Sequence, residues 1–176
     1  MSAMKKYIDR AYAMRVTKAK IIDVSSVAVG YWVRLKCQFG CGSYNTRWTC
    51  PPYSPTPEYM RKMLGEYSKG LLIQIEDIPG KKERKIRVQI ENIVADLERE
   101  IFLDGYHKAF GMAAGPCGLC RTCDTTKDCI HPERARPSME ACGIDVYQTA
   151  RNNGFTLEVV TSEEACCSLV ALILIE

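Results

Sequence analysis

Ten cysteines stand in this chain of 176 residues, and eight of them fall into two groups that could bind a metal. The second group begins with Cys117, Cys120 and Cys123, separated by two residues each, in the segment CGLCRTCDTTKDC. This spacing lets three thiolates face one centre, as in the bacterial ferredoxin run C-x2-C-x2-C-x3-C-P. The next cysteine, Cys129, follows after five residues instead of three, so the agreement is partial. The spacing favours an iron–sulfur cluster, with zinc and purely structural thiols as alternatives.

The first group has a less familiar spacing, Cys37-x3-Cys41-x8-Cys50, followed at once by two prolines. Glycine and proline around these thiols predict a stiff, irregular loop of the kind that surrounds a metal centre. Three cysteines leave one position of a four-iron cluster without a thiolate. Cys129 or Cys142 could fill that position from elsewhere in the fold, or it could stay open to water or a substrate.

Cys142 is the eighth candidate ligand, predicted to lie in the first turn of a helix that begins after Ser138. The positive end of that helix would stabilise a thiolate, whereas the alternative is a small buried residue. Eight thiolates are the number that two fully ligated [4Fe–4S] clusters require. Spacing alone leaves open how Cys129 and Cys142 divide between the two sites.

The other candidate residues have simpler explanations. Cys166 and Cys167 precede the last apolar stretch and are expected to pack in the core. His131 is a better ligand candidate than His107, because it lies close to Cys129 in the sequence. Four arginines flank the cysteine groups, where they are surface charge or offset the negative charge of thiolates; they are Arg47, Arg121, Arg134 and Arg136.

Composition is that of a soluble globular protein, with 47% hydrophobic and 26% charged residues and a net charge of +3. The one dense basic run, KKERK at 81–85, is explained by a solvated helix start, and no nucleic-acid motif accompanies it. Neither a membrane span nor a signal peptide is expected. The sequence therefore predicts a cytoplasmic protein, a compartment where disulfides are rare and clustered cysteines indicate metal.

Strand and helix patterns alternate along the chain. We expect strands at 29–35, 71–78, 106–113, 155–160 and 168–176. We expect helices near the N-terminus, after Thr56 and up to Gly70, over 86–101, and over 138–153. The prediction is a single α+β or α/β layered domain over residues 1–176, with a mixed sheet, helices packed on it, and two cysteine-rich loops at 37–50 and 117–142.

The segments CQFGCGSYNTRWTCPPYSPTPE and GPCGLCRTCDTTKDCIHPERARPSMEACGIDV together carry a resemblance. The chain resembles an uncharacterised family of cysteine-rich, predicted metal-binding proteins of anaerobic archaea and bacteria, known as a domain of unknown function. The resemblance covers most of the chain, from the segment before Cys37 to the last strand. It implies an anaerobic context and the metal ligands Cys37, Cys41, Cys50, Cys117, Cys120, Cys123 and Cys129, but no reaction.

Nucleotide-binding loops and hydrolase elbows are absent from the sequence, so the metal centres are the main source of chemistry. The leading hypothesis is an electron-transfer protein with one or two [4Fe–4S] clusters and a redox partner protein, without a nucleic-acid or membrane partner. The alternatives are an enzyme with an open iron on the three-cysteine cluster and a zinc-stabilised binding module. The substrate and the oligomeric state are not predicted.

Overall fold

The computed structural model describes residues 4–162 and 165–176. The helices in these residues are α1 (Lys5–Ala13), α2 (Trp32–Gly40), α3 (Pro57–Leu64), α4 (Glu83–Leu103) and α5 (Val146–Asn152). The strands are β1 (Lys18–Asp23), β2 (Lys69–Ile78), β3 (Phe110–Met112) and β4 (Cys167–Leu174). Three short 3₁₀ helices complete the list: η1 (Val24–Ser26), η2 (Gly80–Lys82) and η3 (Glu140–Cys142).

The strands form one sheet in the order β1-β2-β4-β3, and each neighbouring pair is antiparallel. The mixed sheet expected from the sequence is therefore wrong for the described strands, and the α+β class is confirmed. Strand β4 lies in the interior of the sheet, as its continuous apolar run predicted. Its residues from Val170 to Leu174 are all buried, which matches a central strand covered on both faces.

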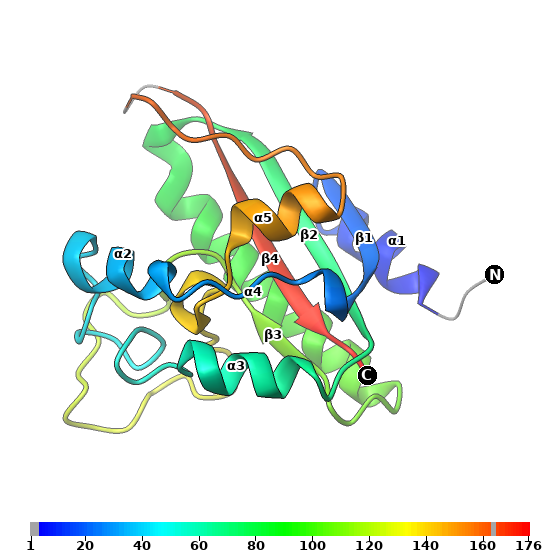
Figure 1. Cartoon of the computed structure of the whole chain (residues 1–176), viewed down its shortest axis with the longest axis horizontal. Coiled ribbons are helices and arrows are strands. Elements are labelled where there is room, and N and C mark those ends of the chain that lie inside the picture. Colours follow the sequence, from blue (N-terminus) through cyan, green and yellow to red (C-terminus); the bar gives the residue numbers. More distant parts are fainter. Residues whose placement is uncertain (1–3, 163–164) are drawn as a thin grey trace.

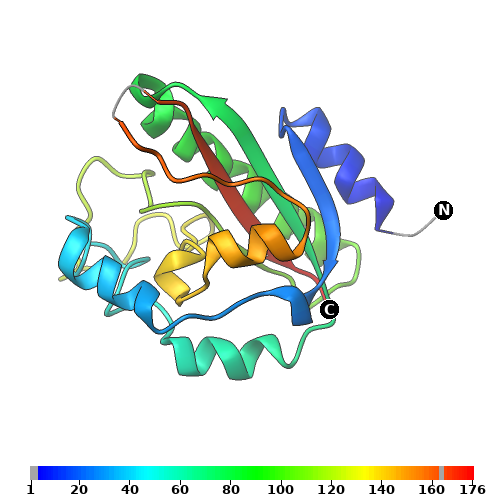
Figure 2. The same cartoon turned by 45° about the horizontal axis from the view of Figure 1, so that its top comes forward.

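Helices cover both faces of the sheet (Figures 1 and 2). One face packs against α1 and α4, and its core includes Tyr7, Leu97 and Ile173. The other face packs against α3, η3 and α5, and its core includes Met60 and Leu172. Successive β4 residues thus point into different cores, as the two-residue period of a strand requires.

Helix α4 confirms the clearest pattern in the sequence. Its apolar stripe at i, i+4, i+7 and i+8 is buried against the sheet, with Ile90, Val94 and Leu97 fully enclosed. Helix α3 confirms the predicted start, since the Tyr59 backbone N–H donates to Thr56 Oγ1 at 3.2 Å. No helix in the described part of the chain is long and apolar enough to cross a membrane.

Gly70 does not close α3, contrary to the prediction. The helix ends at Leu64, and Gly70 lies in β2, opposite Leu174 of β4. A Cβ at Gly70 would lie 3.0 Å from Leu172 Cδ1, so the residue serves close packing within the sheet.

The strand predicted at 29–35 is also wrong, because α2 occupies most of this stretch. The alternation of apolar residues did not reflect two faces of a sheet. Only Val33 is buried, whereas Tyr31 and Leu35 are 53% and 56% exposed. Local helical structure places these side chains on the surface and carries Cys37 near the helix end.

The single helix predicted over 138–153 is interrupted. Gly143 adopts a left-handed conformation with φ of 80°, which separates η3 from α5. Helix α5 then begins at its own cap, where Asp145 accepts from the Gln148 backbone N–H at 2.9 Å. The stretch 155–160 is not a strand either, and Val159 is 68% exposed.

Candidate metal centres

The first cysteine group is held together by Arg34, three residues before Cys37 on α2. Arg34 Nη1 donates to Ser54 Oγ at 2.9 Å and to the Ala141 carbonyl at 2.6 Å. Ser54 Oγ donates to the same Ala141 carbonyl at 2.6 Å. These bonds tie α2, the loop that follows Cys50, and η3 into one unit.

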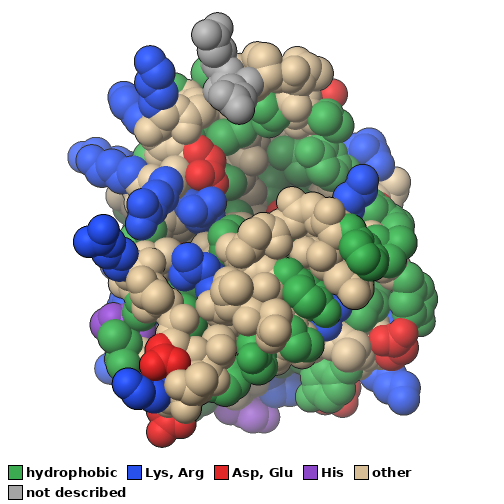
Figure 3. All heavy atoms as spheres, turned by 90° about the vertical axis from the view of Figure 1, so that its left-hand side faces the viewer, with side chains coloured by type: hydrophobic (Ala, Val, Ile, Leu, Met, Phe, Trp, Pro, Cys, Tyr) green, Lys and Arg blue, Asp and Glu red, His purple; other side chains and the backbone are tan. Residues whose placement is uncertain are grey.

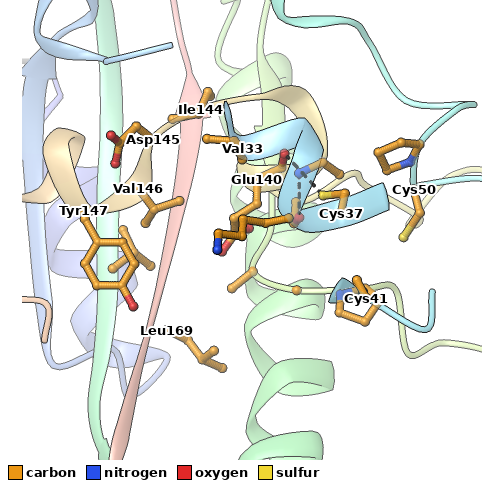
Figure 4. A pocket seen from close by; sticks show the side chains of 18 of the residues that line it. Val33, Cys37, Cys41, Cys50, Glu140, Ile144, Asp145, Val146, Tyr147 and Leu169 are labelled. Atoms are coloured by element: carbon orange, nitrogen blue, oxygen red, sulfur yellow. Dashed lines mark hydrogen bonds between the residues drawn. The ribbon is translucent and has the colours of Figure 1, made fainter. Parts of the chain in front are cut away.

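Cys37, Cys41 and Cys50 line the same cavity, whose volume is about 370 Å³. Figure 4 shows the cavity with the three thiols toward one end and Val146, Tyr147 and Leu169 toward the other. The lining is mostly apolar, and its size falls within the range of small-molecule sites. The first group thus borders a space much larger than a metal ion.

Burial raises the pKa of two thiols of this group, Cys37 and Cys50. Burial, with the neighbouring Cys41 as the second cause, raises the pKa of Cys50 to about 11. The same two causes raise the pKa of Cys37, and the nearby Arg34 opposes them. Cys37 also donates a weak hydrogen bond to the Glu140 carbonyl at 4.0 Å. A metal would have to displace these protons in order to bind.

Glu140 lines the same cavity and was not anticipated as a site residue. Its Oε2 atom is buried without a hydrogen-bond partner among the described residues. Burial raises the pKa of this carboxyl, opposed by hydrogen bonds from its own backbone, Ser138 and Gly115. A buried acceptor without a partner is costly, which makes Glu140 a candidate for contact with a bound group.

Cys142 lies at the end of η3, beneath the first group rather than on the cavity wall. Its side chain is fully buried in the core that includes Met139 and Ile144. The expected stabilisation of its thiolate by a helix start is wrong, because α5 begins only at Val146 and burial raises the Cys142 pKa to about 12. Its role as a ligand stays a prediction.

The second group surrounds a separate cavity of about 20 Å³, lined by four of its five cysteines. The cavity wall therefore contains Cys117, Cys120, Cys123 and Cys129, together with His131. This arrangement places Cys129 beside the C-x2-C-x2-C segment, a position that spacing had left open. The four thiols lie on a loop that is close to the surface, and each is partly exposed.

Helix α4 supports the second group through a buried carboxylate. Glu91 is only 2% exposed, and its Oε2 accepts from the Gly118 backbone N–H at 2.9 Å. Burial, followed by a hydrogen bond with Glu91, raises the pKa of Cys117 to about 12. A Cβ at Gly118 would lie 2.6 Å from Val88 Cγ2, so glycine lets the loop approach the helix closely.

Arg47 lies between the two groups. It borders the second cavity, and its charge opposes the rise in the pKa values of both Cys50 and Cys120. Its Nε atom is buried and has no partner among the described residues. The adjacent Trp48 Nε1 donates to the Lys127 carbonyl at 2.9 Å and connects the two loops. The cysteine groups are therefore neighbours that share one cation.

The donor chemistry of both groups fits a thiophilic metal or an iron–sulfur cluster, because thiols converge on each cavity with a cation between them. Within residues 4–162 and 165–176, however, no three His, Cys, Asp or Glu side chains lie in an arrangement that could hold a metal ion. The thiols of each group line a common cavity, but they are not arranged around a single point as metal ligands would be. The side chains of each loop would have to turn toward a centre on binding.

The remaining candidates serve structure. Arg136 pairs with Glu98 through Nε–Oε2 at 2.6 Å and Nη2–Oε1 at 2.7 Å, and this pair is largely buried. Arg134 Nη2 pairs with Asp96 Oδ1 at 2.9 Å, and Asp96 lies on α4, as Glu98 does. Cys167 packs partly against the core, as expected. The same expectation is wrong for Cys166, which is exposed just before β4 begins.

Glu91 and Arg34 were missed in the sequence, although each left a signal. Glu91 is a charged residue directly between the apolar positions of the α4 stripe. Arg34 has helical spacing to Cys37, but the strand expected there concealed it.

Comparison with protein families agrees with this donor set. Residues 20–175 match the model of the family described as "Predicted metal-binding protein (DUF2284)". The match spans most of the chain, so this protein belongs to that family of predicted metal-binding proteins of unknown function. Searches of curated proteins and of solved structures gave no match.

Proposed function

We propose that the protein is an iron–sulfur protein that binds up to two [4Fe–4S] clusters and transfers single electrons to or from a redox partner in the cytoplasm of an anaerobe. The observation that carries this proposal is the convergence of Cys117, Cys120, Cys123 and Cys129 on one cavity. Four thiolates with C-x2-C-x2-C spacing suit a cubane cluster better than zinc, which usually takes two separated pairs.

A second cluster is proposed at Cys37, Cys41 and Cys50. The chain's own contribution is to gather the thiols, exclude water with the apolar wall, and offset negative charge with Arg34 and Arg47. An iron–sulfur cluster, when bound, supplies the one-electron chemistry. Two sites separated by Arg47 suit electron passage between them.

The test is the metal content of protein isolated without oxygen after expression in iron-rich medium. We expect brown protein with broad absorption near ~400 nm and nearly equal amounts of iron and sulfide. Colourless protein with stoichiometric zinc would refute the cluster assignment and favour a zinc-stabilised module.

One observation favours a second candidate function, an enzyme with an open iron at the first group. The large cavity reaches Cys37, Cys41 and Cys50, whereas Cys142 lies in the core away from its wall. A three-thiol site beside an apolar cavity could admit a substrate that binds through sulfur.

Cys142→Ser decides between the carrier and the open-site enzyme. If Cys142 completes the first site, the substitution changes one of the two EPR signals and leaves the other intact. An unchanged spectrum, with a wild-type signal that shifts when a small thiol or cyanide is added, would support the open site instead.

A further inference from the structure

An exposed basic ridge borders the second cysteine group. We define the basic ridge as five exposed cationic residues on η2, in the first turn of α4 and on the cysteine loop; they are Lys81, Lys82, Arg84, Lys85 and Arg121. Figure 3 shows Lys and Arg side chains gathered along one side of the face where the cysteine loops lie. Hydration of a helix start explains this run in the sequence, but not its position just before the α4 residues that contact the cysteine loop.

Contacts between the loop and α4 place the ridge next to the second group. A Cβ at Gly115 would lie 2.7 Å from Arg87 Cδ, and the Gly118 N–H bonds to Glu91. Lys85 precedes Val88 by three residues, which is about 4.5 Å along a helix axis. The ridge therefore begins within one helical turn of the residues that support Cys117.

The charge of the ridge is mostly uncompensated within the described residues. Glu83, the acid inside the run, pairs with Arg87 at 2.8 Å and not with the ridge. No ion pair joins Lys81, Lys82, Arg84 or Lys85 to a described acidic side chain, although Asp77 lies nearby in the sequence. Glu163 and Glu164 lie outside the described residues, and even their full charge would leave the ridge positive.

An apolar residue stands beside the same thiols. Ile130 directly follows Cys129 and is 75% exposed. A small apolar contact within a charged rim is typical of protein interfaces, including the short-lived ones of redox proteins. Duplex DNA would use the charge but would leave an aliphatic contact on the cysteine loop without a role.

We infer that the basic ridge and Ile130 form the docking surface for a small acidic redox protein, which exchanges electrons with a centre at Cys117, Cys120, Cys123 and Cys129. This inference rests on the proposed electron-transfer function and names the chemistry of the partner. One electron passes from the reduced centre of the partner to the oxidised centre of this chain, without bond formation. Opposite charges speed the encounter and orient the two proteins.

The experiment compares two variants with the same change in net charge. Lys82→Glu/Lys85→Glu reverses two charges of the ridge. Lys62→Glu/Arg99→Glu reverses two exposed charges elsewhere, and Arg99 lies about 21 Å from Lys85 along α4. Reduced plant-type ferredoxin, an acidic protein of low potential, serves as electron donor in stopped-flow absorbance measurements.

We expect the second-order rate for wild type to fall steeply between 50 and 500 mM salt, as an order-of-magnitude range for screening. At low salt the ridge variant should react about tenfold more slowly, whereas the control variant stays within about twofold of wild type. Reduced ridge variant should in turn react faster than wild type with cytochrome c, a basic acceptor. Ile130→Ser should slow the ferredoxin reaction without changing its salt dependence.

Equal slowing in both double variants, or a rate independent of salt, would overturn the inference. So would tight binding of a 20-base-pair DNA duplex that depends on the ridge while the ferredoxin reaction does not. Iron, sulfide and the EPR signal after dithionite reduction are measured on the same samples without a partner. If wild-type protein has no iron, no sulfide and no EPR signal, the proposed function is refuted, and the docking of an electron donor with it. If these signals are present but the rates do not depend on charge, only the docking surface is refuted.

Discussion

The two cysteine groups differ in what surrounds them. The second group places four thiols around about 20 Å³ of space, with Glu91 beneath the loop. The first group places three thiols at the edge of about 370 Å³, with apolar side chains beyond them. Both share Arg47 as a neighbouring cation. The second group has the donors for a closed centre, whereas the first leaves room for a ligand from outside the chain.

This difference separates two tasks that a pair of centres could perform. A closed four-thiolate centre near the surface suits exchange of electrons with another protein. A three-thiolate centre beside a cavity suits either relay of electrons or contact with a small molecule. If this difference is real, the two groups respond independently to substitution and differ in the number of thiolates that they supply.

The largest expected effect is the loss of one centre. Cys120→Ala removes a thiol from the closed group, so we expect iron content to fall by about half and the loop to lose order. Cys167→Ala is the matched control, because that thiol starts β4 and lines neither of the two cavities, and its metal content should equal that of wild type. Iron analysis and the thermal midpoint measure both variants. Equal iron loss in the two would contradict this division of the cysteines.

Much of the scaffold in this comparison follows from the sequence. The apolar stripe of α4 and the continuous apolar run of β4 are long and regular, so they predicted buried elements correctly. Thr56 and Pro57 predicted the start of α3 because caps act locally. The C-x2-C-x2-C segment of Cys117, Cys120 and Cys123 was also visible, since it stands within one short loop, whereas spacing left open that Cys129 lines the same cavity.

Other features depend on contacts across the fold. Most apolar residues of α2 are exposed, so their spacing does not follow the buried face of a helix. Gly143 interrupts the helical pattern that the sequence shows over 138–153. The placement of Cys142 in the core follows from that interruption. The burial of Glu91 depends on a loop 27 residues later in the chain, because its Oε2 accepts a hydrogen bond from the Gly118 N–H of that loop. These features depend on distant packing, which spacing does not encode.

The second prediction concerns pH and counts the thiolates in each group. Raised pKa values, about 11 for Cys50 and about 12 for Cys117, keep these thiols protonated at pH 7 in the metal-free chain. Metal binding must release those protons, so affinity rises with pH and falls in acid. Co²⁺ titrations between pH 6 and 7.5 should give slopes of log affinity of about 3 for the first group and about 4 for the second.

Each group can be measured alone for this purpose, with Cys120→Ala leaving the first group complete and Cys41→Ala leaving the second. Thiolate-to-cobalt absorption reports binding directly. Identical slopes of about 4 would indicate that Cys142 joins the first group, because a fourth proton would then be released there.

The smallest expected effect concerns the tuning of the closed centre by Glu91. Glu91→Gln retains an oxygen that can accept from the Gly118 N–H but removes a buried negative charge. Reduction adds negative charge to a centre, so removing a nearby carboxylate favours the reduced form and raises the reduction potential. A unit charge at about 8 Å with an effective dielectric constant of about 20 predicts a shift of roughly 50–90 mV.

Redox titration monitored by EPR should show this shift in one signal, with iron content unchanged. Glu66→Gln, at an exposed residue after α3, is the control and should leave both potentials at their wild-type values. The first group should also stay unchanged in Glu91→Gln, because Glu91 contacts the loop of the second group. A shift in both EPR signals would mean that the charge of Glu91 acts on both centres. The two cysteine groups would then not be electrostatically independent, which would contradict the comparison made above.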